Sequence, residues 1–232
     1  MKTIYLILIF ITFNIASAQL TSGNIKYKVK VAETPEIPID KMMLSINKNF
    51  YSIIKEFEFE LKFSSKLSSF SKIEKLYSDD EAAKMGSVKI GFLGNYYTSN
   101  DTVYKYGTSR AIGDYIVHHK INKKWIITTE SKTIDRYLCY KALTEKVVTT
   151  AAGTFVHPII AWFCPEMPYA HGPLGYGGLP GVILELQTKD AVFGATEIFL
   201  SNKIIKINKF QNAKLYSEAD LDLLFMKKNS SR

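Results

Sequence analysis

The residue types best suited to chemistry in this chain are two cysteines and four histidines. A nucleophilic thiol needs a base beside it, and Cys139 and His157 fall on neighbouring predicted strands. The sequence supplies no third group to orient that base, and no thiol-protease signature surrounds Cys139. His118 and His119 are adjacent, so on a strand their side chains point to opposite faces and do not share a metal. We therefore predict no catalytic residue, no metal site and no enzymatic activity.

The two cysteines are also candidates for a disulfide. Predicted strands over residues 133–148 and 153–163 form a hairpin that turns near Ala151, so opposed residue numbers sum to about 302. The numbers of Cys139 and Cys164 sum to 303, which puts the two side chains nearly opposite each other. An oxidising compartment favours a bond between them, whereas a one-residue shift in register leaves two separate buried thiols. Both alternatives remain open at this point.

Other patterns typical of catalysis or cofactor binding have simpler structural explanations. Glu58 and Glu60 alternate with phenylalanines, as on the solvated face of a strand. Gly175 and Gly177 match the first two glycines of a dinucleotide-binding fingerprint, but Pro180 takes the third position and a predicted strand follows. No Walker motif is present. The sequence therefore predicts no cofactor.

The N-terminal segment has the features of a secretory signal peptide. Lys2 precedes an apolar run over residues 4–15, and Ala16-Ser17-Ala18 is a cleavage site of the A-x-A type. The run is shorter than the roughly 20 residues of a transmembrane helix, and no later stretch is long and apolar enough to span a bilayer. We expect cleavage after Ala18, a single domain over residues 19–232 without a transmembrane segment, and export to the periplasm or outer envelope.

The composition is that of a folded domain with a basic surface. Of 232 residues, 47% are hydrophobic and 22% are charged, which excludes an intrinsically disordered chain. The formal net charge is +8, but the lysines are scattered along the chain and form no basic stripe. With export expected, this charge indicates a membrane surface or an acidic partner, and we predict no nucleic-acid partner.

Hydrophobic periodicity predicts one long helix and many strands. Apolar residues recur at helical spacing over residues 39–57, and strict alternation begins at Phe57-Glu58-Phe59. Roughly ten segments read as strands, and a capping pattern at Ser217 and Asp220 opens a helix over 218–226. The expected fold class is α+β, with a large curved antiparallel sheet (half-barrel-like) wrapped around a long N-terminal helix, and a short C-terminal helix.

The segment over residues 125–186 contains motifs that go beyond general strand patterns. In order, they are Tyr137-Leu138-Cys139-Tyr140-Lys141, Ala161-Trp162-Phe163, Pro165-Glu166-Met167-Pro168, Gly172-Pro173 and Gly178-Leu179-Pro180-Gly181-Val182-Ile183. In these motifs the chain resembles the GLPGLI family, exported proteins of Gram-negative bacteria, with Val182 in place of the leucine of the name-giving pattern. The resemblance implies export to the cell envelope and a β-rich fold, and it offers no catalytic residues to transfer.

The motif Gly178-Leu179-Pro180-Gly181 is predicted to be structural. Pro180 presets φ at about −65° and Gly181 supplies the positive φ that follows, so we expect a type II turn leading into a buried strand.

The leading functional hypothesis is a non-catalytic envelope protein that binds an apolar or peptide ligand. The predicted binding site lies between the concave face of the sheet and the long helix. It consists of Met42, Met43, Ile46 and Phe50.

The second hypothesis is a protein–protein accessory of an outer-membrane transporter. Its contact surface is the loop over residues 165–178, with Tyr169, His171 and Tyr176 as the interacting side chains. A hydrolase or metal enzyme is the least supported class, because the sequence offers no assembled catalytic or metal-binding site.

Overall fold

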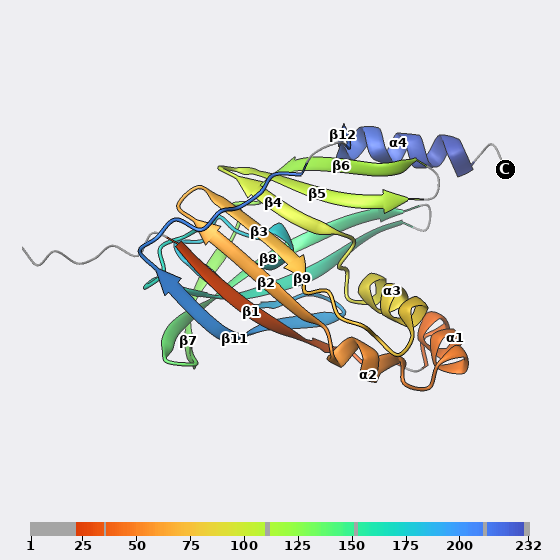
Figure 1. The fold of residues 1–232 in the computed structure, drawn as a ribbon, viewed down its shortest axis with the longest axis horizontal. Helices are drawn as coiled ribbons and strands as arrows, with labels where there is room; N and C mark the ends of the chain where they lie inside the picture. Colours follow the sequence, from red (N-terminus) through yellow and green to blue (C-terminus); the bar gives the residue numbers. More distant parts are fainter. Residues whose placement is uncertain (1–21, 35, 110–111, 151–152, 211–212, 230–232) are drawn as a thin grey trace, which may run out of the picture.

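The computed structural model describes residues 22–34, 36–109, 112–150, 153–210 and 213–229, so the predicted signal peptide lies outside the described residues. Within these ranges the protein is mostly β (Figure 1). The strands are β1 (Ser22–Val31), β2 (Glu58–Ser64), β3 (Leu67–Lys72), β4 (Asn95–Ser99), β5 (Thr102–Ser109), β6 (Gly113–Lys120), β7 (Ile126–Ile134), β8 (Tyr137–Thr150), β9 (Gly153–Cys164), β10 (Val182–Gln187), β11 (Ala191–Ser201) and β12 (Lys214–Ser217).

All the described strands belong to one open sheet of 12 strands. Their order is β12-β6-β5-β4-β3-β2-β1-β11-β10-β9-β8-β7. Neighbours pair antiparallel, except that β12 runs parallel to β6. Strands β2 to β6 therefore form a meander on one side of β1, and β7 to β11 form a second one on the other side.

The helices are short, and three of them lie at one end of the sheet. They are α1 (Pro38–Ile46), α2 (Phe50–Lys55), α3 (Asp80–Lys89) and α4 (Glu218–Asn229), with a 3-10 turn η1 (Pro173–Gly175). Figure 1 shows α1, α2 and α3 gathered at that end and α4 beside β6 and β12. The predicted α+β fold, in which the sheet wraps around a long N-terminal helix, is therefore wrong.

The predicted long helix is interrupted by an asparagine-containing break between α1 and α2. Asn47 has extended backbone angles (φ −140°, ψ 110°), and its side-chain oxygen accepts a hydrogen bond from the Asn49 backbone N–H at 2.8 Å. The Asn47 amide nitrogen also donates to the Asp79 carboxylate at 2.8 Å. Such side-chain hydrogen bonds compete with the helical backbone pattern, so α1 ends before α2 begins.

The apolar residues of α2 are buried against α3 and β1. Phe50, Ile53 and Ile54 are all buried. A side chain at Gly86 of α3 would clash with Ile54, so the two helices can approach this closely only because Gly86 has none. The helical periodicity of this segment therefore reflects packing at the end of the sheet.

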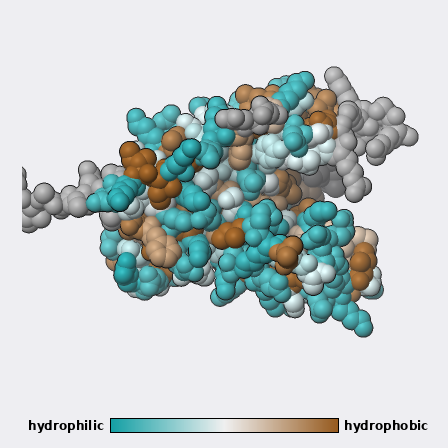
Figure 2. Space-filling view, in the orientation of Figure 1, coloured by the Kyte–Doolittle hydropathy of each residue, from teal (hydrophilic) through white to brown (hydrophobic). Residues whose placement is uncertain are grey.

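The space inside the sheet is filled by aromatic side chains, most of them from the strands themselves. Phe59 of β2 stacks on Phe70 of β3 with 5.4 Å between ring centroids, and it meets Phe193 of β11 edge-on at 5.2 Å. Phe92, which follows α3, lies 5.0 Å from Phe59. All four rings are buried, whereas the face drawn in Figure 2 is mainly hydrophilic with smaller hydrophobic areas. Aromatic packing of this kind contributes beyond the area that it buries.

A glycine-rich loop, residues 165–181, joins β9 to β10 and reaches the other half of the sheet. Its η1 turn contacts β3, β4 and β5. Tyr169 packs on Phe63 of β2 with 5.2 Å between ring centroids. Trp125, just before β7, donates its indole N–H to the Gly177 carbonyl at 2.8 Å. This loop, and not a helix, spans the two halves of the sheet.

After β11 the chain crosses the sheet to its far edge (Figure 1). On the way Phe210 packs on Tyr97 and Tyr106, at 6.4 Å and 5.4 Å between ring centroids. β12 then pairs with β6, and α4 follows directly. Ser217 accepts a hydrogen bond from the Asp220 backbone N–H at 3.1 Å, so the predicted cap and the helix after it are present.

A buried ion pair ties α1 to α3. The Asp40 side chain is 1% exposed and lies 2.9 Å from the Lys89 ammonium, whose side chain is 10% exposed. The hydroxyls of Thr34 and Tyr51 donate to the same carboxylate at 2.7 Å and 2.8 Å. Burial acts to raise the pKa of Asp40, but the hydrogen bonds from Lys89, Thr34 and Tyr51 outweigh it and lower that pKa.

We predict that Asp40→Asn lowers the free energy of unfolding by about 3 kcal/mol, because it leaves the Lys89 charge buried without its main partner. Urea unfolding measures the loss. The matched control is Glu81→Gln, whose partner Lys84 lies 3.7 Å away on the exposed side of α3, and which should change stability by less than about 0.5 kcal/mol. Equal effects of the two substitutions would contradict the prediction.

Candidate functional site

The four predicted ligand-binding residues do not line one space. Met43 and Phe50 are buried in the core. Met42 and Ile46 are 48% and 68% exposed. Two of the side chains therefore support the packing of the helices, and the other two face solvent.

The aromatic residues predicted for a contact surface are packed into the fold. Tyr169 is half-buried on Phe63, and Tyr176 is half-buried against Trp125 at 6.3 Å between ring centroids. His171 is only 4% exposed. A partner that contacts these rings has to move the glycine-rich loop first.

The GLPG motif (Gly178-Leu179-Pro180-Gly181) forms its turn differently from the prediction. The positive φ falls on Gly178 (φ 81°), and Gly181 is not among the residues with positive φ. A side chain at Gly181 would instead collide with the carbonyl oxygen of Cys164 at the end of β9. Gly181 is thus required for a close backbone approach, and the predicted type II turn is wrong.

The two cysteines lie side by side in the core. β8 and β9 pair so that Tyr140 is opposite Phe163, and Cys139 and Cys164 are the next residues in this register. Both are fully buried free thiols whose side chains are hydrogen-bonded to each other. That hydrogen bond raises the pKa of Cys139 and lowers that of Cys164 to about 7.

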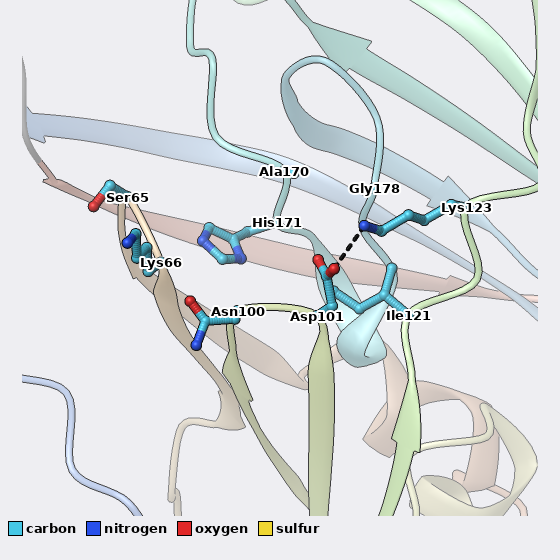
Figure 3. A pocket seen from close by; sticks show the side chains of 9 residues that line it. All are labelled: Ser65, Lys66, Asn100, Asp101, Ile121, Lys123, Ala170, His171 and Gly178. Atoms are coloured by element: carbon cyan, nitrogen blue, oxygen red, sulfur yellow. Dashed lines mark hydrogen bonds and ion pairs between the residues drawn. The ribbon is translucent and has the colours of Figure 1, made fainter.

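Four connections surround a pocket of about 440 Å³ at one end of the sheet (Figure 3). They are the β2–β3 turn, the β4–β5 turn, the segment after β6 and the glycine-rich loop. Every second turn of an antiparallel meander lies at the same end, so the topology brings the first three together. The lining residues are Ser65, Lys66, Asn100, Asp101, Ile121, Lys123, Ala170, His171 and Gly178. The volume is in the range of small-molecule sites.

His171 is the one buried polar side chain among the residues that line this pocket. Its Nε2 lies 3.0 Å from the carbonyl oxygen of Ser64. A carbonyl only accepts hydrogen bonds, so Nε2 carries the proton and Nδ1 presents a lone pair. Nδ1 is buried and has no hydrogen-bond partner. Burial is the main cause that lowers the pKa of His171 to about 4, so the ring is neutral at physiological pH.

The ring of His171 faces two sides of the pocket. Figure 3 shows one ring nitrogen on the side of Ser65 and the other on the side of Asn100 and Asp101. The unpartnered acceptor is thus directed toward the β4–β5 turn. An unmet buried acceptor costs about 1–3 kcal/mol, which a bound donor would recover.

Charged side chains form the rim. Lys123 and Asp101 are paired at 2.7 Å, and the hydrogen bond from Lys123 lowers the pKa of Asp101. Asn100 adopts a left-handed conformation (φ 51°) and donates its backbone N–H to the Lys66 carbonyl at 2.8 Å. The Lys66 ammonium has no ion-pair partner in the described part of the chain. The rim therefore holds an acidic–basic pair and one further positive charge.

Among the side chains that line this pocket, only that of His171 was predicted from the sequence to take part in function. In the sequence, the charged and polar residues of the two hairpin turns are typical of any turn, because Asn and Asp are common in turns for conformational reasons. The only available indication was that Lys66, Asn100, Asp101 and Lys123 each fall between predicted strands. Their meeting depends on strand order, which periodicity does not give.

Two further properties of the described residues bear on function. Within the described ranges, no group of three or more His, Cys, Asp or Glu side chains is arranged to hold a metal ion. No helix in the same ranges has the length and apolar character needed to cross a membrane.

Comparison with protein families matches only part of the chain. Residues 154–185 match a family described as "Protein of unknown function (Porph_ging)". The matched segment runs from β9 through the glycine-rich loop into β10, so it includes His171 and the GLPG motif. No curated protein matches the sequence.

Solved structures with a similar fold include two crystal forms of PNGF-II. The C2 form has a TM-score of 0.53, and the P21 form has a TM-score of 0.52. Both are 13% identical to this chain, and the match covers 89% of this chain but 33% of PNGF-II. This chain thus spans about a third of the length of PNGF-II, and the likeness is one of fold alone.

The buried neutral His171 makes stability depend on pH. Its pKa is about 4 in the folded protein and 6.5 as a free side chain. Between these values the unfolded chain binds a proton that the folded chain does not, so stability falls as pH falls through this window. We predict that wild type loses about 3 kcal/mol more than His171→Gln between pH 7 and pH 4.

Urea unfolding of both proteins at the two pH values measures this difference. Gln keeps an N–H for the Ser64 carbonyl but does not titrate. The carboxylates titrate in both proteins, so their contribution cancels. An equal loss in the two proteins would show that His171 is not held neutral.

Proposed function

We propose that this chain is a GLPGLI-family protein, exported to the cell envelope, that binds a ligand without catalysing a reaction. Two observations support the family assignment: the motifs of the segment over residues 125–186, and the match of residues 154–185 to a family of unknown function. The signal-peptide pattern that ends at Ala18 supports export.

The observation that carries the binding function is the unpartnered Nδ1 of His171 beside a pocket of about 440 Å³. Buried polar atoms are hydrogen-bonded in the great majority of cases, and an exception calls for an explanation. A ligand that donates a hydrogen bond to Nδ1 would explain why this atom has no partner within the protein. The sequence led us to expect either an apolar or a peptide ligand. The charged rim favours the polar, peptide-like ligand.

The alternative is a protein–protein accessory of the envelope. It is supported by an exposed apolar pair near the end of the β8–β9 hairpin. Val147 and Val156 are opposite each other and are 60% and 52% exposed. Exposed apolar side chains that lie together are typical of interaction surfaces.

We predict that the protein purified gently from the envelope carries a small ligand. Native mass spectrometry should detect a discrete extra mass that denaturation releases. His171→Gln should lose that mass, and Lys41→Gln, which changes an exposed lysine on α1, should keep it. A bare mass for wild type would contradict the binding function, and a larger protein partner in the same spectrum would favour the accessory role.

Export also leads to a prediction for the two thiols. Cys139 and Cys164 are in contact, so an oxidant in the envelope, such as a protein disulfide, can take one hydrogen from each thiol and join the sulfurs. The intact mass of the unreduced protein should be lower by two hydrogens, with no alkylation after denaturation. The bond should stabilise the fold by about 3 kcal/mol relative to Cys164→Ser. Alkylation at both thiols would contradict this prediction.

A further inference from the structure

We infer that the pocket beside His171 binds an acylated α-amino carboxylate, the group found at the C-terminus of a peptide. This inference rests on the proposed binding function and names the ligand class. It follows from two requirements of residues that line the pocket, one for negative charge at Lys66 and one for a hydrogen-bond donor at His171.

The requirement for negative charge comes from the lysines of the rim. Lys66 lies on the β2–β3 turn, and within the described residues its ammonium has no ion-pair partner. Lys123 is shared with Asp101, and Lys120 of β6 adds a further positive charge close enough to lower the pKa of Asp101. Positive groups thus outnumber the one carboxylate. A ligand carboxylate at Lys66 balances them, and the Asn100 amide on the next turn can donate to it.

The requirement for a donor comes from His171. Its Nε2–H is committed to the Ser64 carbonyl, so Nδ1 can only accept. Because the pKa of the ring is about 4, protonation does not satisfy Nδ1 at neutral pH. A ligand that has only a carboxylate therefore meets the requirement for negative charge but leaves Nδ1 without a donor. The last amide N–H of a peptide is separated from its terminal carboxylate by one carbon atom, so a peptide end brings a donor and a negative charge into the pocket together.

The geometry also indicates how such a ligand enters. Nδ1 is covered in the structure, and Figure 3 shows the Asn100 side chain beside the His171 ring. Asn100 is exposed, so its side chain can turn aside as the ligand arrives. The rest of a peptide then leads out past the exposed rim residues Ser65 and Ala170. The site thus recognises the C-terminal end of a peptide ligand and not the side chains of that peptide.

The first test compares two pools of acetylated tripeptides by isothermal titration, one with free carboxyl ends and one with carboxamide ends. The free acids should bind at least about tenfold more tightly, because a charge-assisted hydrogen bond is lost on amidation. Lys66→Gln should remove this difference, and Lys41→Gln should leave it unchanged. Equal binding of acids and amides to wild type would overturn the inference.

The second test addresses His171. A depsipeptide pool, in which an ester oxygen replaces the last amide N–H, should bind wild type about tenfold more weakly than the peptide acids. His171→Gln should bind both pools equally, because its amide lacks the Nδ1 acceptor at that position. A lasting preference for the peptide over the ester in His171→Gln would overturn the role of Nδ1.

The outcomes separate this inference from the proposed function. If wild type carries a native ligand by mass spectrometry but binds neither tripeptide pool, the ligand class is wrong and the binding function stands. If it carries no ligand and binds neither pool, both are wrong. N-acetylalanine distinguishes the source: binding as tight as that of the tripeptides means a free acylated amino acid, and weaker binding means a peptide end.

Discussion

The glycine-rich loop can bridge the two halves of the sheet because its backbone lies closer to other backbone than any side chain would allow. A Cβ at Gly177 would meet the carbonyl oxygen of Ala170, and one at Gly181 would meet that of Cys164. The first approach folds the loop back on itself, with the Gly178 N–H donating to Ala170 at 3.2 Å. The second fastens the end of the loop to the end of β9. The position of His171 depends on both.

These contacts make the loop a fixed part of the fold. The Ile183 N–H donates to the His171 carbonyl at 3.0 Å, and the Val182 N–H donates to Met167 at the same distance. Leu174 is buried in a left-handed conformation (φ 55°), which side chains of its size rarely adopt. Such a conformation persists only where surrounding contacts determine it. The pocket wall is therefore built before any ligand binds, which lowers the entropy that binding has to overcome.

Local patterns in the sequence predicted the strands well and the helices in part. Alternation at Phe57-Glu58-Phe59 corresponds to β2, and the predicted hairpin turning near Ala151 corresponds to β8 and β9 with a register one residue from that expected. The helix over residues 39–57 was wrong because its apolar period continues across the Asn47 break, where side-chain hydrogen bonds end the helix. The pocket was beyond reach of such patterns, because its residues come from four connections that only the strand order brings together.

The route of the C-terminal segment has a mechanical consequence. β12 is a strand of four residues at the edge of the sheet, and the chain reaches it only after crossing from β11. Tension applied at the C-terminus therefore loads the contacts of α4 with β6 first. The short parallel pairing of β12 and the ring contacts of Phe210 follow, before any force reaches the antiparallel strands. The C-terminal segment can therefore detach from the edge of the sheet while the remaining strands and the pocket stay folded. A surface or fusion partner attached at that end would thus be decoupled from the binding site.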